Sequence, residues 1–321
     1  MVGESDEPPE GDYAFRGQPG QAKWPEMVYG GALSFLRRRY SRDLADVDVA
    51  VTGIPFDSAT SNRPGARLGP RAIRAASTMV AELDAFPWGF DPFEHLEVVD
   101  VGDCQFDFGY QHHAVEVIES HASAILDTDT TLLSLGGDHF VTYPLLRAHA
   151  ERHGPLALVH FDAHTDTWAD DGARLDHGSM FLRAVREGLV RPDRSVQLGI
   201  RTVNPDDHGF TVVTAPAVHE QGTAPIAAQI EQVVGDHPAY VTFDIDCLDP
   251  AFAPGTGTPV PGGLSTAQAL ALVRSLGGLR LVGFDVVEVA PAYDHAEITA
   301  LAAAAIAHDM LCLLAQQRRS G

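Results

Sequence analysis

The chain has 321 residues, of which 45% are hydrophobic, so it can bury a sizeable core. It carries 44 acidic and 22 basic residues, a formal net charge of −22, which argues against the basic face that nucleic-acid binding needs. The acidic balance is compatible with a cationic ligand, and equally with a surface adapted for solubility or salt.

Cysteine usage and the N-terminus indicate a cellular compartment. Cys104, Cys247 and Cys312 are far apart and form no CxxC pair, so neither a disulfide framework nor a zinc-finger site is expected. The N-terminus is acidic without an apolar core, unlike a signal peptide, and we expect no uninterrupted apolar run of membrane-spanning length. These features predict a cytoplasmic protein with no membrane partner.

The chain divides into an arm and one domain. Residues 1–25 are rich in proline, glycine and acid and are typical of a flexible N-terminal arm, whereas residues 26–321 are predicted to form a single domain, with no linker or repeat inside Val47–Gln317. Apolar runs predict strands, in chain order, at Val47–Ile54, Leu96–Val101, Thr131–Leu135, Leu156–Phe161, Ser195–Ile200, Phe210–Val213, Ala239–Ile245 and Leu279–Val287. Helical periodicity predicts helices at Gly69–Leu83, Val115–Leu126, Pro144–His153, Ala224–Gly235, Ser265–Gly278 and Ala296–Gln317.

Nearly all-apolar strands separated by helices predict an α/β domain with a parallel sheet covered on both faces. Sites in such sheets form outside the carboxyl ends of the strands. Three predicted strands end there in polar clusters, namely "GGDH" at 136–139, "DAHTD" at 162–166 and "DID" at 244–246. Alternate residues of an extended chain share one face, so the acids within each of the last two clusters point the same way.

If these strands are neighbours, two histidines and four carboxylates converge: His139, Asp162, His164, Asp166, Asp244 and Asp246. Buried carboxylates without partners are costly, and a pair of divalent cations resolves the cost. This oxygen-rich donor set favours a Mn²⁺-like ion over a thiolate zinc site, and two ions about 3.5–4 Å apart can hold a water as hydroxide near neutral pH. Each cluster alone is more typical of a turn or helix cap, but their joint occurrence favours metal binding.

The quoted clusters, with "CLDPAFAPGTGTPVPGG" and "DVVEVAPAYD", resemble the signatures of the ureohydrolase (arginase/agmatinase) superfamily from about Val51 to Met310, and most closely those of bacterial agmatinases. The resemblance implies a three-layer α/β/α fold around an eight-stranded parallel sheet. It also implies two Mn²⁺ per subunit and a homo-oligomer, a trimer or hexamer.

Residue by residue, the resemblance implies one manganese held by His139, Asp162, Asp166 and Asp244, and a second held by Asp162, His164, Asp244 and Asp246. Asp162 and Asp244 would bridge the two ions. Glu288 matches the carboxylate that binds the substrate guanidinium, and His177 matches a proton-shuttling histidine. Asp166 is a second candidate for delivering a proton to the leaving amine. Without the resemblance, Glu288 would be read as an ordinary ion-paired acid and His177 as a surface residue.

The implied reaction is the hydrolysis of agmatine to putrescine and urea by a metal-bridging hydroxide. Alternatives are a guanidinobutyrase, an arginase, a proclavaminate amidinohydrolase-like enzyme, an enzyme acting on free guanidine, and a catalytically silent metal-binding homologue. Mn²⁺ is expected, but Co, Ni or Fe stays open as the native metal. Asp170, Asp171 and Asp176 favour a substrate that ends in an amine, whereas Arg174 could pair with a carboxylate.

The segment "PFDSATSNRPGARLGPRAIR" lacks the Lys-Ser/Thr ending of a Walker A nucleotide loop. We expect it to line the mouth of the pocket, with Gly65 and Gly69 in tight turns and Pro70 at the start of a helix. Cys247 should point away from Asp246, and His112 and His113 should be solvated.

Overall fold

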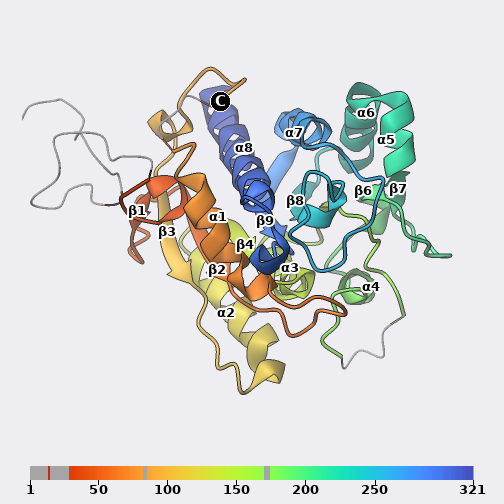
Figure 1. The fold of residues 1–321 in the computed structure, drawn as a ribbon, viewed down its shortest axis with the longest axis horizontal. Helices are drawn as coiled ribbons and strands as arrows, with labels where there is room; N and C mark the ends of the chain where they lie inside the picture. The colour runs from red at the N-terminus through yellow and green to blue at the C-terminus, as the bar shows by residue number, and fades with distance from the viewer. Residues whose placement is uncertain (1–13, 15–28, 82–84, 170–173, 321) are drawn as a thin grey trace, which may run out of the picture.

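The structure is a computed structural model that describes Ala14 and residues 29–81, 85–169 and 174–320. The flexible arm predicted at residues 1–25 lies outside these described residues, except for Ala14. A single continuous sheet with flanking helices organises the described chain (Figure 1).

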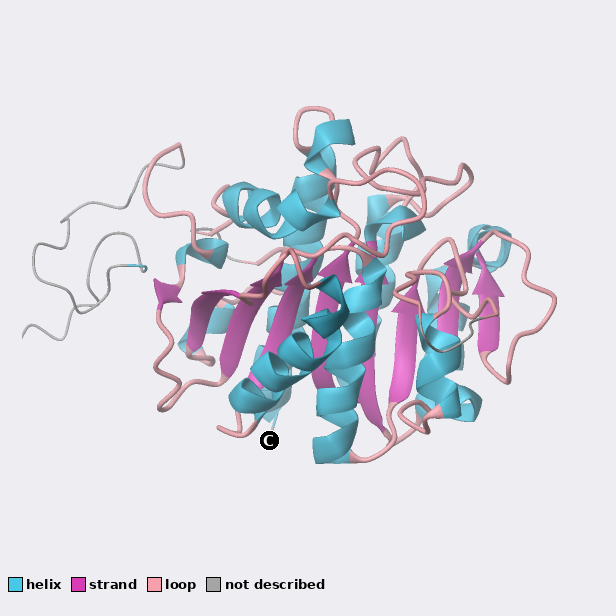
Figure 2. Ribbon diagram, turned by 90° about the horizontal axis from the view of Figure 1, so that it is seen from below, coloured by secondary structure: helices cyan, strands magenta, loops and turns pink. Residues whose placement is uncertain are grey.

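The sheet contains nine strands in the order β1-β3-β2-β4-β9-β8-β5-β6-β7, and every neighbouring pair is parallel. Figure 2 shows the strands side by side with helices packed against them. In chain order the strands are β1 Arg39–Tyr40, β2 Val49–Ile54, β3 Val98–Asp103, β4 Thr131–Gly136, β5 Ala157–Phe161, β6 Val196–Ile200, β7 Thr211–Thr214, β8 Pro238–Asp244 and β9 Arg280–Val287.

Helices cover both faces of the sheet. The described α-helices are α1 Gly69–Ser77, α2 Ala114–Leu126, α3 Thr142–His153, α4 Met180–Arg186, α5 Ala215–Gln221, α6 Thr223–Val234, α7 Thr266–Arg274 and α8 Ile298–Ser320. One apolar core joins the sheet to α1, α5, α6, α7 and α8, and a second core joins it to α2, α3 and α4. Neighbouring strand residues alternate between these cores, with Leu133 in the first and Leu132 in the second. This is the three-layer arrangement that the apolar strands predict.

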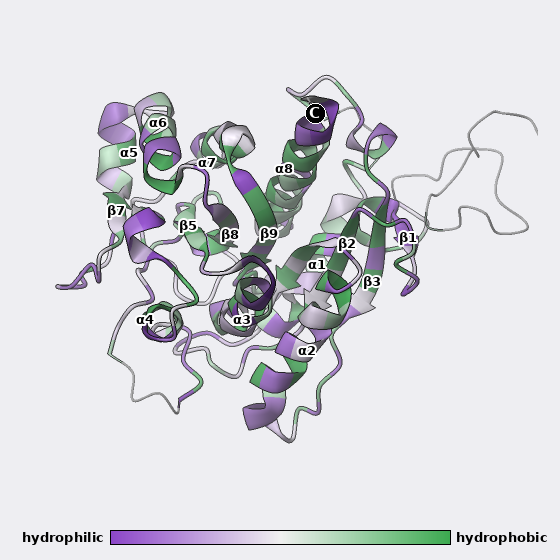
Figure 3. Ribbon diagram, turned by 180° about the vertical axis from the view of Figure 1, so that it is seen from behind, coloured by the Kyte–Doolittle hydropathy of each residue, from purple (hydrophilic) through white to green (hydrophobic). Residues whose placement is uncertain are grey.

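Helix α8 is a core helix. Residues Ile298–Arg319 are long and apolar enough to cross a membrane, but 78% of their most apolar window is buried inside the protein. Figure 3 shows α8 as largely hydrophobic, with its polar end at the C-terminus. The expectation that no such run occurs is corrected accordingly, because a helix that packs on a sheet can be as apolar as a membrane span.

The eight predicted strands correspond to β2–β9, but the sheet has a ninth strand, so the predicted count is wrong by one. That strand, β1, is a two-residue edge strand paired with β3, and its residues Arg39 and Tyr40 form no apolar run. The six predicted helices also form, although α1 ends at Ser77 and part of its predicted extension lies outside the described residues. The seven-residue helices α4 and α5 were not predicted.

Candidate metal centre and substrate pocket

Four adjacent strands, β4-β9-β8-β5, bring the predicted residues together at their carboxyl ends. His139 follows β4, in a 3₁₀ turn that Asp138 caps by accepting a hydrogen bond from the Phe140 amide. Asp162 follows β5 directly, Asp244 ends β8, and Glu288 follows β9. The expectation that the strands bearing the clusters are near neighbours is therefore confirmed, with β9 inserted between β4 and β8.

His139 is buried among three carboxylates. Its Nδ1 atom lies 3.0 Å from Asp162 Oδ2, 3.0 Å from Asp166 Oδ2 and 3.3 Å from Asp244 Oδ2, yet it forms no hydrogen bond of acceptable geometry with any described residue. A ring nitrogen cannot satisfy three oxygens by hydrogen bonding. One shared cation would satisfy all four atoms, so these donors fit a divalent metal ion.

A second group of donors lies beside the first. His164 Nδ1 is 3.2 Å from Asp162 Oδ1 and 3.1 Å from Asp246 Oδ2, and the three residues form a compact set of ligand atoms. Asp162 belongs to both groups, as a bridging carboxylate requires. Asp244, the other predicted bridge, faces His139 through Oδ2 and accepts the Asp246 amide at 2.7 Å through Oδ1.

The protonation tendencies of these groups reflect their crowding. Burial, followed by the charges of Asp246 and Asp162, raises the pKa of Asp244 well above its ordinary value. Burial opposes a charge on His164, but Asp246 and Asp162 outweigh it and raise its pKa to about 12. Protons thus supply the positive charge that cations would supply, and cation binding must displace them.

Polar residues behind the donors hold them in place. Gln197 Nε2 donates to His160 Nδ1 at 3.2 Å, so His160 presents its Nε2 proton to Asp162 Oδ2 at 2.7 Å. Thr242 Oγ1 donates to Asp285 Oδ1 at 2.6 Å and therefore accepts from His139 Nε2 at 2.8 Å. The sequence reasoning missed these residues. His160 and Thr242 each lie two positions before a predicted ligand, on the same strand face, and that spacing could have identified them.

Glu288 and His177 form a pair next to the donors. Glu288 Oε1 accepts the His139 amide at 2.9 Å and faces His177 Nδ1 at 2.8 Å, while the buried Oε2 atom has no partner among the described residues. Glu288 has φ 64° and Asp166 has φ 51°, in the left-handed region that non-glycine residues rarely adopt. Such strain is typical of functional positions.

The state of His177 follows from its two neighbours. Burial lowers its pKa, but the hydrogen bond and charge of Glu288 outweigh burial and raise the pKa to about 9. The Ser61 amide, however, donates to His177 Nε2 at 3.0 Å, and an amide can only donate. We assign the resting tautomer from this hydrogen bond, with Nδ1 protonated toward Glu288 and Nε2 as acceptor.

A cavity of about 320 Å³ opens over these groups. Its walls include the predicted ligands His164, Asp166 and Asp244 together with His177, and also Ser61, Trp168, Asp176, Gly178 and Thr258. Ser61 belongs to the segment expected at the pocket mouth, and that expectation is confirmed. Of the acids expected to attract an amine, Asp176 lines the cavity, while Asp170 and Asp171 lie outside the described residues. Arg174 is exposed, and its Nη2 lies 3.1 Å from Asp176 Oδ2.

The expectations for the glycines and the proline near the pocket mouth, and for Cys247, were partly right. Gly65 has φ 132° and does make the turn, and Pro70 lies in the first turn of α1, as its second residue. Gly69 is not in a turn, because it has φ −56° as the first residue of α1. Its small size matters for another reason, since a Cβ there would lie 2.6 Å from the Val289 carbonyl oxygen. Cys247 is buried and directs Sγ toward the Leu198 carbonyl, away from the donors.

Known proteins resemble this chain in sequence and fold over nearly its whole length. Residues 47–312 match the arginase family. The chain is 58% identical to an agmatinase of Chromobacterium violaceum over 99% of both chains. The crystal structure of a hypothetical agmatinase from Burkholderia thailandensis is 58% identical with a TM-score of 0.93, covering 97% of this chain and 99% of that one. Proclavaminate amidino hydrolase from Streptomyces clavuligerus is 42% identical with a TM-score of 0.84, covering 91% of this chain and 100% of that one. The chain belongs to the arginase family.

Proposed function

We propose that this protein is an agmatinase-type ureohydrolase, which hydrolyses agmatine with water to give putrescine and urea and uses two Mn²⁺ ions. Two observations together carry the proposal. Two His/Asp donor groups share Asp162, and beside them lies a buried carboxylate oxygen of Glu288 that has no partner among the described residues. The similarity to agmatinases over nearly the whole chain supports the same conclusion.

The residues that would hold the ions are those of the two donor groups. His139, Asp162, Asp166 and Asp244 would hold one, and Asp162, His164, Asp244 and Asp246 the other. When bound, such ions supply hydroxide from water near neutral pH and stabilise negative charge on the substrate. Mn²⁺ is proposed because carboxylate oxygens outnumber imidazole nitrogens and thiolates are absent from these two groups.

Glu288 would bind and orient the substrate guanidinium. Its Oε2 atom is buried and has no partner within the part of the chain that the structure describes, and a buried carboxylate oxygen gains most from a cationic donor. Oε1 is already fixed by the His139 amide and His177, so the free oxygen has a defined direction. The planar guanidinium would thus be held with its central carbon facing the donor groups.

His177 would move the proton that the leaving amine needs. It lies beside Glu288 and lines the cavity over the donor groups, so it would reach the nitrogen atoms of a guanidinium bound to Glu288. Asp166 also lines the cavity and is the alternative donor. Proton transfer to the amine lets the C–N bond break and urea form without expelling an amide anion.

The second charge of the substrate is the basis for choosing agmatine. Agmatine carries an ammonium opposite its guanidinium, where arginine and guanidinobutyrate carry a carboxylate. Asp176 would meet this end from the cavity wall, and Trp168 lines the wall beside it. Arg174 favours the carboxylate alternatives, and its ion pair with Asp176 engages the charges of both residues, so the choice of agmatine rests also on the similarity to agmatinases. The 42% identity to a proclavaminate amidino hydrolase keeps guanidino acids as the second candidate class.

A substrate panel tests the proposal. Urea release from agmatine, arginine, 4-guanidinobutyrate and guanidine should be measured with the Mn²⁺-loaded enzyme, beside an elemental analysis of bound metal. We expect agmatine to have the highest kcat/KM and arginine to be used poorly. Asp176→Asn should lower the ratio of agmatine to guanidinobutyrate turnover about tenfold, by weakening one charge-assisted contact. A higher kcat/KM for guanidinobutyrate or guanidine would refute the substrate, and bound metal without any urea would indicate a silent homologue.

The proposal includes the cellular compartment of the enzyme and its oligomeric state. The three cysteines, which are far apart and form no CxxC pair, support a cytoplasmic enzyme. We propose a trimer or hexamer on the family resemblance alone, and light scattering of the purified protein would distinguish these from a monomer or dimer.

A further inference from the structure

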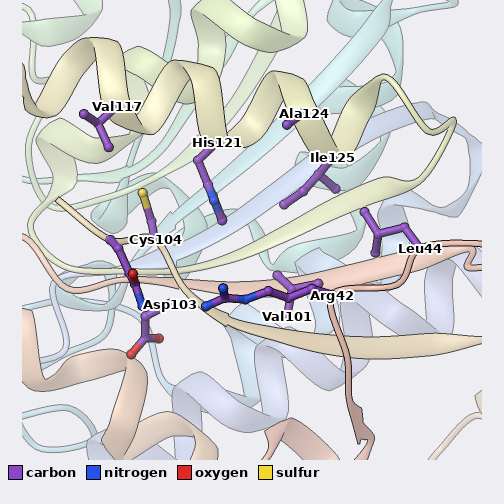
Figure 4. Close-up of a pocket in the computed structure, with 10 residues that line it drawn as sticks. Arg42, Leu44, Val101, Asp103, Cys104, Val117, His121, Ala124 and Ile125 are labelled. Atoms are coloured by element: carbon purple, nitrogen blue, oxygen red, sulfur yellow. The ribbon is translucent and has the colours of Figure 1, made fainter.

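A second cavity of about 360 Å³ lies between helix α2 and the edge of the sheet formed by β1 and β3 (Figure 4). Arg42 and Leu44 contribute from the segment after β1, Val101 and Cys104 from the end of β3, and His121 from α2. It shares no lining residue with the cavity over the donor groups. Its size falls in the range of small-molecule sites, about 300–1,000 Å³.

The Arg42 guanidinium is the unmatched charge of this cavity. Among the described residues, no carboxylate forms an ion pair with it, and Figure 4 shows its head directed into the space below His121. Asp103, the acid on the cavity wall, has its carboxylate 2.5 Å from Arg74 Nη1. A guanidinium that faces a cavity without a carboxylate of its own is a binding group for a planar oxyanion.

His121 adds a polar group whose orientation is fixed. Thr52 Oγ1 donates to the Gly102 carbonyl at 3.1 Å and accepts from His121 Nε2 at 2.8 Å. Burial, and secondarily the charge of Arg42, lowers the pKa of His121, so at neutral pH the ring adds no second positive charge. The polar part of the cavity is therefore formed by Arg42 and the neutral imidazole of His121, together with Asp103 and Gln105.

The remaining wall is apolar. It is formed by Leu44, Val101, Val117, Ala124 and Ile125. Burial raises the pKa of the Cys104 thiol to about 12, so this residue is a neutral wall and not a nucleophile. A cavity with a few polar side chains in an otherwise aliphatic wall is typical of a site for a short amphipathic molecule.

We propose that this cavity binds a small organic monoanion, a carboxylate on a short aliphatic chain, with the carboxylate on Arg42 and the chain against Leu44, Val101 and Ile125. A monoanion is specified because Arg42 can balance only one negative charge, and the Asp103 carboxylate on the cavity wall would repel a second one. Arg74 carries a single charge between Asp100 and Asp103, so a dianion would meet repulsion that a monoanion mostly avoids.

Binding of butyrate to the Mn²⁺-loaded, full-length protein tests this site, with 1-butanol and butylamine as neutral and cationic controls of the same length. Isothermal titration and the shift in thermal midpoint should both show saturable binding of butyrate and none of either control. Arg42→Gln should weaken butyrate binding at least tenfold. Ala124→Leu, which fills the cavity and leaves Arg42 in place, should weaken it as well.

The matched control is Arg191→Gln, which removes an exposed arginine near β6, at the other end of the sheet from β1. It should bind butyrate as the unmodified protein does. Butyrate could also bind at the metal centre, but that binding would be unaffected by Arg42→Gln. Equal butyrate affinity in the Arg42→Gln variant, equal binding of 1-butanol, or no saturable butyrate binding would each overturn the proposal.

Discussion

The orientation of His139, which follows β4, is decided by a threonine hydroxyl on β8, two strands away in the sheet. Thr242 has one proton, which it gives to Asp285, so it can only accept from His139 Nε2. Nδ1 then carries a lone pair directed at the three carboxylates. Asp285 also accepts from Thr142 and Tyr240, which hold its carboxylate in place. The metal-facing tautomer is therefore built into strands β8 and β9.

Replacement of Thr242 tests this role. Thr242→Val keeps the branched shape but removes the acceptor for His139 Nε2, so Mn²⁺ affinity should fall about 10–100-fold. The control is Thr142→Val, which removes a donor to the same Asp285 and leaves the His139–Thr242 hydrogen bond intact. Mn²⁺ titration of the chelator-treated protein measures both. Equal Mn²⁺ affinities of the two variants would contradict a specific role for Thr242.

Replacement of Glu288 separates substrate binding from metal binding. Glu288→Gln keeps an oxygen for the His139 amide but removes the negative charge that would meet a guanidinium. Loss of one partner of a buried charge pair is worth about 3–5 kcal/mol, so kcat/KM for agmatine should fall by at least a hundredfold. Metal content should stay unchanged. A variant that keeps near-normal kcat/KM would show that another residue binds the guanidinium.

The sequence identifies residues whose chemistry is unusual for their position, and misses those whose chemistry is ordinary. An acid after a buried strand is costly, so Asp162 and Asp244 were visible as candidates. A threonine inside a strand is common, so the only sequence signal for Thr242 is its position two residues before Asp244, and its contact with His139 depends on how the strands assemble. The exact partner of Glu288 likewise depends on β4 and β9 lying side by side, which only the folded chain shows.

Helix α1 is fastened to strand β3 by one buried arginine. Arg74 Nε and Nη2 donate to the two oxygens of Asp100 at 2.8 and 2.9 Å, and both side chains are almost fully buried. Asp100 also accepts the Phe35 amide at 2.8 Å. This bidentate pair sets the position of α1, and α1 follows the segment that lines the pocket mouth.

Removal of the arginine alone should be severe. Arg74→Met leaves the Asp100 carboxylate buried and unpaired, so the free energy of unfolding should fall by about 3–5 kcal/mol. Arg74→Met combined with Asp100→Asn should recover part of the loss, because the uncompensated charge is gone while an acceptor for Phe35 remains. Urea unfolding followed by circular dichroism measures both variants. Equal losses in the single and double variants would mean that charge burial is not the cause.

At the scale of elements, the strands were predictable because burial on both faces makes each an apolar run. The shorter elements lack such a signal. Helices α4 and α5 have seven residues each, about two turns, which is too short for a 3.6-residue period to emerge. Strand β1 exists only because β3 offers it an edge to pair with. Its hydrogen bonds are tertiary contacts, and local sequence carries no trace of them.

Across the whole molecule, two buried histidines couple the fold to pH. His149 in α3 donates Nδ1 to the Leu145 carbonyl at 2.7 Å, and its buried Nε2 has no partner among the described residues. His308 in α8 stacks on Phe93. Burial lowers the pKa of each to about 4. His149 lies in the helical layer on one face of the sheet and His308 in the layer on the other face. Protonation of a histidine is therefore disfavoured in both apolar cores.

The consequence is a loss of stability in mild acid. The unfolded chain takes up a proton at each histidine near pH 6.5, whereas the folded protein resists it until about pH 4. Neither state is protonated above pH 7, so the loss of stability begins below about pH 6.5, grows as the pH falls, and reaches about 3 kcal/mol per histidine near pH 4.

Replacement of His308 tests this pH dependence. His308→Gln cannot titrate and should reduce the slope of unfolding free energy against pH, between pH 6.5 and 5, by up to about 1.4 kcal/mol per pH unit. His112→Gln, at an exposed histidine, should leave the slope unchanged, and the carboxylates of the metal centre titrate alike in both variants and cancel from the comparison. Urea unfolding at fixed ionic strength supplies the slopes, and a His308→Gln slope equal to that of the unmodified protein would show that His308 is not excluded from protonation by the fold.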